Sequence, residues 1–377
     1  MTTNIALQET ELLDAAVAWL QERLPPTWEV AKSNRVIQGG NPPQAQSLVD
    51  GAIDIRGTQG IQVTLAVEAK RSFAPRDVER ILPGISRVLR TLAGNVPLLV
   101  VAPWLSARTQ ELLAKDGINY IDLTGNALVN LEYPALFIQS TGASRDPTPQ
   151  PRAPARMRGP RAARLVRLLI DVTPPYGVRD VASATGLNPG YVSKLLETLD
   201  SEALVDRSKR GRIESVDIKG ILQRWAESYD VFKTNTASRF VAPKGAAQLL
   251  SQLQDTPNRL AVTGSFAAVR YAPVAAPSLL LAYSDNALSA GADLQLLPSD
   301  EGANVILLQP YDDIVWQRTS WSEEIRYVGL SQVAVDCLTG NGRMPAEGEA
   351  LISWMLENEA EWRITSLNEL SQSGNDG

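Results

Sequence analysis

The apolar and polar positions of residues 1–144 change repeatedly between the helical and the strand period. Apolar residues three or four apart predict helices over residues 10–24, 75–92 and 106–115. Strands are predicted between these helices, and the apolar run Leu98–Ala102 is typical of a strand that is covered on both faces. This order predicts a mixed α/β domain over residues 1–144.

Residues 145–160 follow no regular period, because five prolines are interspersed with arginines there. We interpret this stretch as a linker. Residues 233–365 again mix predicted strands with helices, and the polar residues 366–377 are predicted to be a flexible tail. The fold class predicted for the whole chain is therefore α/β multidomain.

Between the linker and the C-terminal domain, residues 161–232 show the pattern of a winged helix-turn-helix. Arg161–Asp171 predicts an amphipathic helix, and two further helices follow with a break at Gly186. Asn188 and Pro189 are residue types preferred at the cap and at the first position of the last of these helices. Two short strand-like segments around the turn SKRGR then predict a β-hairpin, the wing.

The chain has a formal net charge of −6, yet its basic residues are concentrated locally. Seven arginines and one aspartate lie between Arg145 and Ile170, which gives this stretch a charge of +6 (7 − 1). A local basic patch, rather than the average charge of the chain, attracts phosphate. We therefore predict that the module binds double-stranded DNA, with a homodimer as the form that reads a pseudo-palindromic site.

The predicted DNA contacts come from three parts of the module. Arginines three residues apart form a basic ridge on the first helix, the recognition helix presents its N-terminal part to base edges, and the wing carries cations for phosphates or the minor groove. No cofactor is required for such binding. The candidates are Arg161, Arg164 and Arg167 on the ridge, Asn188, Gly190, Tyr191, Ser193 and Lys194 on the recognition helix, and Lys209, Arg210 and Arg212 on the wing.

Histidine is absent from the chain, and Cys337 is the only cysteine. These facts exclude Ser-His and Cys-His catalysis, internal disulfides and multi-cysteine metal sites, so any chemistry must use carboxylates and lysine. A single cysteine is typical of a reducing compartment, and no apolar run reaches the roughly 18 residues that span a membrane. A cytoplasmic protein without a membrane partner is predicted.

Three segments carry a resemblance to a known family. These segments are the winged helix, AVTGSFAAVRYAPVAAPSLLLAYSD and VGLSQVAVDCLTGNGRMPAEGEALISWM. Through them, residues 160–360 resemble the AbiEi-type antitoxin and regulator family. The resemblance implies a winged helix joined to an α/β domain, and repression of the operon that encodes a nucleotidyltransferase toxin. That cognate toxin is then an expected protein partner.

The C-terminal domain itself is similar to a nucleotidyltransferase fold, because Gly264–Ser265 follows a predicted strand and could offer backbone N–H groups to a phosphate. An active enzyme of that class needs an Asp-x-Asp or Asp-x-Glu pair shortly afterwards to hold magnesium. Asp285 and Asp293 are far along the chain and unpaired, and the adjacent Asp312 and Asp313 would point to opposite faces of an extended chain. We expect a structural or protein-binding role for this domain.

In the N-terminal domain, Asp54 is followed after a hairpin turn by Glu68-Ala69-Lys70. This order resembles the D…ExK pattern of PD-(D/E)xK nucleases, whose restriction-endonuclease-like fold has the same order of elements. Glu68 and Lys70 share one face of a strand, and Asp54 on the paired strand is expected to reach the same point. The resemblance implies that Asp54 and Glu68 hold Mg²⁺ and that Lys70 orients the attacking water. Ile53 replaces the usual proline, and ExK is also common on ordinary solvated strands.

The polar segment Asp122–Asn126 predicts a tight turn with Gly125 at positive φ, and a contact with a partner or nucleic acid is the alternative.

The sequence leaves three functions open. The first is a sequence-specific DNA-binding transcriptional regulator, for which the resemblance implies a toxin–antitoxin or phage-defence operon. The second is a magnesium-dependent DNA endonuclease that its winged helix directs to DNA. The third is a scaffold whose winged helix docks protein, and it predicts no salt-dependent affinity for DNA.

Overall fold

The fold is that of a computed structural model, which describes residues 9–33, 38–39, 46–47, 49–80, 82–92, 96–148, 157–253, 258–367 and 369. The chain divides into two compact units, residues 1–153 with 201–203 and residues 154–200 with 204–377. Part of the predicted linker, residues 149–156, lies outside the described residues.

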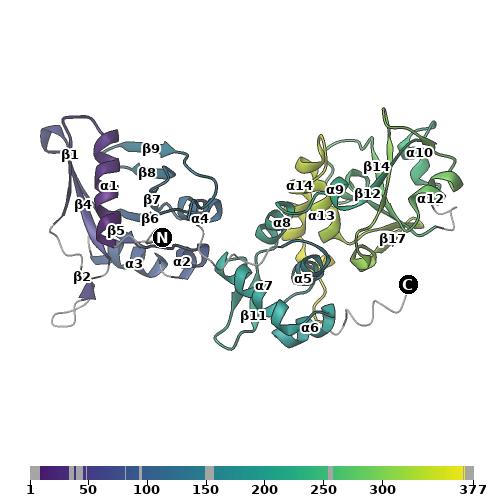
Figure 1. The fold of residues 1–377 in the computed structure, drawn as a ribbon, viewed down its shortest axis with the longest axis horizontal. Coiled ribbons are helices and arrows are strands. Elements are labelled where there is room, and N and C mark those ends of the chain that lie inside the picture. Colours follow the sequence, from purple (N-terminus) through teal and green to yellow (C-terminus); the bar gives the residue numbers. More distant parts are fainter. Residues whose placement is uncertain are drawn as a thin grey trace, which may run out of the picture. The chain divides into compact units, whose positions relative to one another are not determined.

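The first unit contains a seven-stranded sheet in the order β1-β4-β5-β6-β7-β8-β9, with helices on both faces (Figure 1). Its central strand pairs, β5 with β6 and β6 with β7, are parallel, and the outer pairs are antiparallel. The strands are β1 (Glu29–Lys32), β4 (Gly51–Arg56), β5 (Gln62–Ala69), β6 (Leu98–Ala102), β7 (Asn119–Asp122), β8 (Ala127–Leu131) and β9 (Leu136–Ser140), and a separate ribbon is formed by β2 (Gln38–Gly39) and β3 (Gln46–Ser47). The helices are α1 (Glu9–Arg23), η1 (Thr58–Gly60), α2 (Pro75–Arg80), α3 (Leu82–Leu92) and α4 (Ala107–Lys115).

The apolar pattern explains this layering. Leu12 and Leu20 of α1 pack against one face of the sheet, whereas Val78 of α2 and Leu113 of α4 belong to the core on the other face. The five residues of β6 are all buried, as expected for a strand covered on both sides. The predicted mixed α/β class of this domain is therefore confirmed.

The second unit begins with three helices and a hairpin. These are α5 (Pro160–Asp171), α6 (Val178–Thr185), α7 (Pro189–Ser201), β10 (Val205–Arg207) and β11 (Ile213–Val216). Gly186 ends α6 in the left-handed region at φ 66°, where a side chain would be strained. The order predicted from the sequence for this segment is the order in the structure.

The remainder of the second unit is a second seven-stranded sheet, in the order β15-β12-β16-β14-β13-β18-β17, with helices packed around it. Its strands are β12 (Thr236–Val241), β13 (Leu260–Thr263), β14 (Leu280–Ser284), β15 (Leu297–Pro298), β16 (Val305–Gln309), β17 (Ser320–Ser322) and β18 (Ile325–Tyr327). Its helices are α8 (Ile218–Ala226), α9 (Val231–Thr234), α10 (Ala246–Leu250), α11 (Ser265–Ala268), α12 (Ala287–Asp293), η3 (Asp313–Trp316), α13 (Leu330–Leu338), α14 (Met344–Glu357) and α15 (Glu359–Trp362). One apolar core runs from Met157 to Ile364 through both parts.

A buried carboxylate lies inside this core. Asp336 of α13 has no exposed surface and accepts hydrogen bonds from Tyr229, Thr263, Tyr283 and Gln332. Burial raises the pKa of Asp336 to about 6, although these hydrogen bonds to the carboxylate act in the opposite direction. Each buried polar group of this cluster needs its partners, so the network fixes how α13 packs on β13 and β14.

Helix α5 is joined to the C-terminal part by a buried arginine. Arg167 is 1% exposed, and its guanidinium donates to the carbonyl oxygens of Ile314 and Gln317 and to Ser331 Oγ. At Gly329 an added Cβ would lie 2.6 Å from Arg167 Nη2, so a larger residue there would force the guanidinium to shift.

The C-terminal end of α5 is held by two further arginines. Arg363 donates to the carbonyl oxygens of Ile170 at 3.0 Å and Val172 at 2.9 Å, and Arg318 donates to that of Asp171 at 3.0 Å. The last carbonyl groups of a helix have no partner within the helix, and arginine side chains satisfy them here.

We expect Arg167→Ala to lower the free energy of unfolding by about 3–5 kcal/mol, because it leaves buried carbonyl groups without donors and removes one partner of the buried Asp171. Arg161→Ala on the exposed end of α5 is the matched control, with an expected change within about 0.5 kcal/mol. Urea unfolding of both variants measures the difference. Equal midpoints would show that Arg167 does not anchor the helix.

Candidate functional site

The predicted recognition residues occupy the beginning of α7. Asn188 Oδ1 accepts a hydrogen bond from the Gly190 amide at 2.8 Å, as a residue capping a helix does. Asn188, Gly190 and Lys194 are exposed, and Ser193 is half-buried and donates to Glu197 at 3.4 Å. The first turns of α7 therefore offer polar groups to an outside partner.

Tyr191 is half-buried and packs against the core of the second unit. Burial raises the pKa of its phenol, and the nearby positive charge of Arg161 acts in the opposite direction. Arg161 is itself exposed. Arg161 therefore lies near Tyr191 of α7, although it was predicted to belong to a separate ridge.

The tip of the β10–β11 hairpin carries exposed cations. Gly211 has φ 81° and donates its amide to Ser208 O at 2.8 Å, which closes the turn. Lys209, Arg210 and Arg212 around it are all exposed. This geometry leaves three positive charges in solvent on a short antiparallel hairpin.

The predicted basic ridge on α5 is wrong for Arg167, whereas contact of Arg164 with DNA stays a prediction, since its side chain is 41% exposed. Arg167 is buried by the C-terminal part of the same unit and cannot touch a phosphate. Arg164 is paired with Asp312, through Nε at 3.1 Å and Nη2 at 2.7 Å. A three-residue spacing shows which residues share a helix face, but it does not show whether another part of the chain covers that face.

In the first unit, Glu68 and Lys70 lie together at the end of β5. Lys70 Nζ is 2.9 Å from Glu68 Oε1, and the Glu68 side chain is nearly buried. Asp50 directly precedes β4 and accepts a hydrogen bond from the Ala69 amide at 2.8 Å. The acid that the structure brings to Glu68 is therefore Asp50.

The prediction that Asp54 reaches Glu68 is wrong. Asp54 pairs with Thr64 in the β4–β5 ladder and accepts its hydroxyl at 2.6 Å, and it also contacts Arg56 at 3.6 Å. Thr64 and Glu68 are four residues apart, roughly 13 Å along a strand.

The register of the β4–β5 pair explains why Asp50, and not Asp54, lies beside Glu68. The ladder pairs Gly51 with Val67, so the same register carried one residue further places Asp50 opposite Glu68. Residues directly opposite each other in an antiparallel pair are neighbours, whereas an acid elsewhere on the strand is not.

The Glu68 carboxyl group is buried and lies near charges of both signs. Burial raises its pKa, the hydrogen bond from Lys70 lowers it, and the negative charges of Asp50 and Glu9 raise it again. No group of three or more His, Cys, Asp or Glu among the described residues is arranged to hold a metal ion. Two carboxylates nevertheless fit Mg²⁺, which usually keeps several waters and takes one or two carboxylates from the protein.

The Gly264–Ser265 segment has no acidic pair of the kind that a nucleotidyltransferase needs. Ser265 donates to Glu347 of α14, and the antiparallel register pairs Thr263 with Leu281 and Leu260 with Ser284. The same register carried one residue further places Asp285 opposite Arg259, five residues from Gly264 and roughly 17 Å along the strand.

The Asp122–Asn126 segment is a structural turn, as expected, with Gly125 at φ 104°. Asp122 is fully buried and accepts hydrogen bonds from the amides of Leu105, Thr124 and Asn126. With these bonds its carboxylate is committed to holding the loop.

No protein-family model matches the chain, and comparisons with curated proteins and with solved structures also found no match. Within the described part of the chain, no helix is both long and apolar enough to cross a membrane.

We expect Asp50→Asn to lower the pKa of Glu68, because it removes a negative charge that opposes ionisation. The matched control is Asp54→Asn, which is expected to leave the pKa of Glu68 unchanged. NMR titration of the side-chain carboxyl carbons measures both variants. An equal shift in the two variants would contradict the assignment of Asp50 to this cluster.

Proposed function

We propose that residues 161–232 form a winged helix-turn-helix and that the protein is a sequence-specific double-stranded DNA-binding regulator. The observation that carries this proposal is the combination of an exposed, polar start of α7 with a hairpin tip bearing three exposed cations. A recognition helix of this kind enters the major groove, and wing cations contact phosphates or the minor groove.

The two surfaces have different tasks in this proposal. Lys209, Arg210 and Arg212 provide affinity that does not depend on sequence and weakens with salt, because phosphate contacts release counterions. Asn188 and Lys194 at the start of α7 provide base choice. Regulation follows from occupancy of the DNA, and a homodimer would match a pseudo-palindromic site. Repression of an operon that also encodes a toxin, with that toxin as partner, is the setting that the family resemblance suggests.

We expect the double variant Arg210→Ala/Arg212→Ala to bind all duplexes more weakly and to reduce the slope of log K against log salt by about 2, since each phosphate contact contributes roughly 0.9. The control Arg239→Ala/Lys244→Ala removes the same charge from exposed positions on the second sheet domain and should keep the wild-type slope. Titration of the protein's own upstream DNA and of a shuffled duplex at several salt concentrations measures both. Salt-independent binding, or an equal loss in the control, would favour a winged helix that docks protein.

A second candidate function is magnesium-dependent DNA cleavage by the first unit, and the cluster of Asp50, Glu68 and Lys70 favours it. The two carboxylates would hold Mg²⁺, which supplies charge stabilisation and a more acidic bound water. Lys70 is 2.9 Å from Glu68 and its side chain is 30% exposed, so its ammonium could orient an attacking water or a phosphate oxygen. The winged helix would bring this unit to its DNA.

If the first unit cleaves DNA, Glu68→Gln and Lys70→Met should each lower the Mg²⁺-dependent rate by roughly 10²-fold or more, without weakening DNA binding. Asp54→Asn should keep the rate, because Asp54 is bonded to Thr64 away from the cluster. Gel assays of plasmid and linear DNA with and without Mg²⁺ give the rates. If the wild-type protein does not cut DNA, the nuclease function is rejected and the regulator remains as the proposed function.

A further inference from the structure

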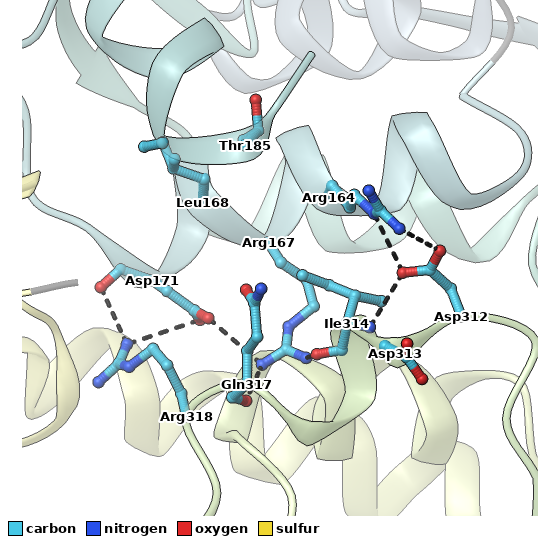
Figure 2. Close-up of a pocket in the computed structure, with 11 residues that line it drawn as sticks. Arg164, Arg167, Leu168, Asp171, Thr185, Asp312, Asp313, Ile314, Gln317 and Arg318 are labelled. Atoms are coloured by element: carbon cyan, nitrogen blue, oxygen red, sulfur yellow. Dashed lines mark hydrogen bonds and ion pairs between the residues drawn. The ribbon is translucent and has the colours of Figure 1, made fainter. Parts of the chain in front are cut away.

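A pocket of about 200 Å³ lies within the second unit, where helices of the helix-turn-helix meet the segment that contains η3 (Figure 2). Its lining comes from α5, from Ala184 and Thr185 at the end of α6, and from residues 312–318. This volume is below the roughly 300–1,000 Å³ of pockets for drug-sized ligands. The space therefore suits a small, polar molecule.

Two guanidinium groups of the lining lie beside one carboxylate. Arg167 and Arg318 share the single carboxylate of Asp171, at 3.5 Å and 3.8 Å. Burial lowers the pKa of Arg318, the charge of Asp171 raises it, and the charges of Arg167 and Arg363 lower it. Arg318 already donates through Nη1 and Nη2 to the carbonyl oxygens of Asp171 and Trp362, so a carboxylate from outside would meet its charge and its remaining N–H groups.

Another part of the lining carries negative charge, from Asp312 and Asp313. Asp312 is committed to Arg164, whereas its exposed neighbour Asp313 receives no hydrogen bond to its carboxylate among the described residues. Ala184 and Thr185 belong to the last turn of α6, where carbonyl oxygens and the negative end of the helix dipole favour a positive group. Asp313 and Arg318 both belong to the lining, and in the view of Figure 2 they lie on either side of Arg167 and Gln317.

We propose that this pocket binds a small zwitterion, a free α-amino acid, as an effector. Its carboxylate lies toward Arg318, and its ammonium lies toward Asp313 and the end of α6. The uncharged remainder fills the space beside Leu168 and Ile314.

The position of the pocket gives the ligand a route to the recognition helix. Thr185 is followed by the Gly186 turn, which leads directly into α7. A ligand that contacts α6 and η3 together stabilises one arrangement of α6, and it shifts DNA affinity only if the DNA-bound arrangement differs in ligand affinity. This regulatory consequence rests on the proposed DNA binding, but occupancy of the pocket does not.

Isothermal titration calorimetry of the full-length protein with a panel of free L-amino acids tests the pocket, with acetate and methylammonium as probes of each charge alone. We expect at least one amino acid to bind, and acetate and methylammonium to bind at least tenfold more weakly. Asp313→Asn should weaken amino-acid binding about tenfold, since it removes one charge-assisted contact. Asp300→Asn, an equally conservative change at an exposed position outside the pocket, should not.

The proposal is overturned if no amino acid binds, if Asp313→Asn binds as tightly as the wild type, or if acetate alone binds as well as the amino acids. A DNA titration with and without the bound amino acid then measures the coupling. Loss of DNA binding under all conditions with intact calorimetric binding would reject the DNA-binding function and keep the pocket. Intact DNA binding without amino-acid binding would reject the pocket and keep the DNA-binding function.

Discussion

The architecture of the second unit depends on the burial of the Arg167 guanidinium. Removing a charged side chain from water costs several kcal/mol, and only a complete set of acceptors offsets this cost. Those acceptors are the carbonyl oxygens of Ile314 and Gln317, the hydroxyl of Ser331 and the carboxylate of Asp171. Helix α5 is therefore shared between residues 160–216 and the part of the unit that contains the second sheet, and neither part can shift on it without breaking these bonds.

This attachment limits which surfaces can meet an outside partner. Arg167 of α5 is buried and Arg164 is paired with Asp312, whereas the start of α7 and the hairpin tip keep exposed polar and cationic side chains. The same contacts hold Arg167, Asp171 and Arg318, which line the pocket beside Asp313. The anchoring of α5, the proposed DNA surface and the proposed effector site are thus consequences of one packing arrangement.

The first unit follows a separate constraint, the register of the β4–β5 hairpin. That register sets Asp50 beside Glu68 and Lys70 and leaves Asp54 with Thr64. A shift of the strand register by one or four residues changes which acids are neighbours, although the order of the acids along the chain stays the same. The pairing of β4 with β5 therefore decides which charged side chains lie together in this unit.

The sequence by itself determined the local elements. Apolar periodicity predicted the helices and strands of the first unit. The turn between α6 and α7 was predicted from Gly186, Asn188 and Pro189, and the turn at Asp122–Asn126 was predicted from Gly125. These signals act within a few residues of the chain. The sequence also supplied Glu68 and Lys70, since residues two apart on a strand share a face. Tertiary structure decided the burial of Arg167, the pairing of Arg164 with Asp312 and the choice of Asp50 over Asp54. Each of these joins residues that are distant in sequence, and a pattern along one segment carries no information about which other segment packs against it.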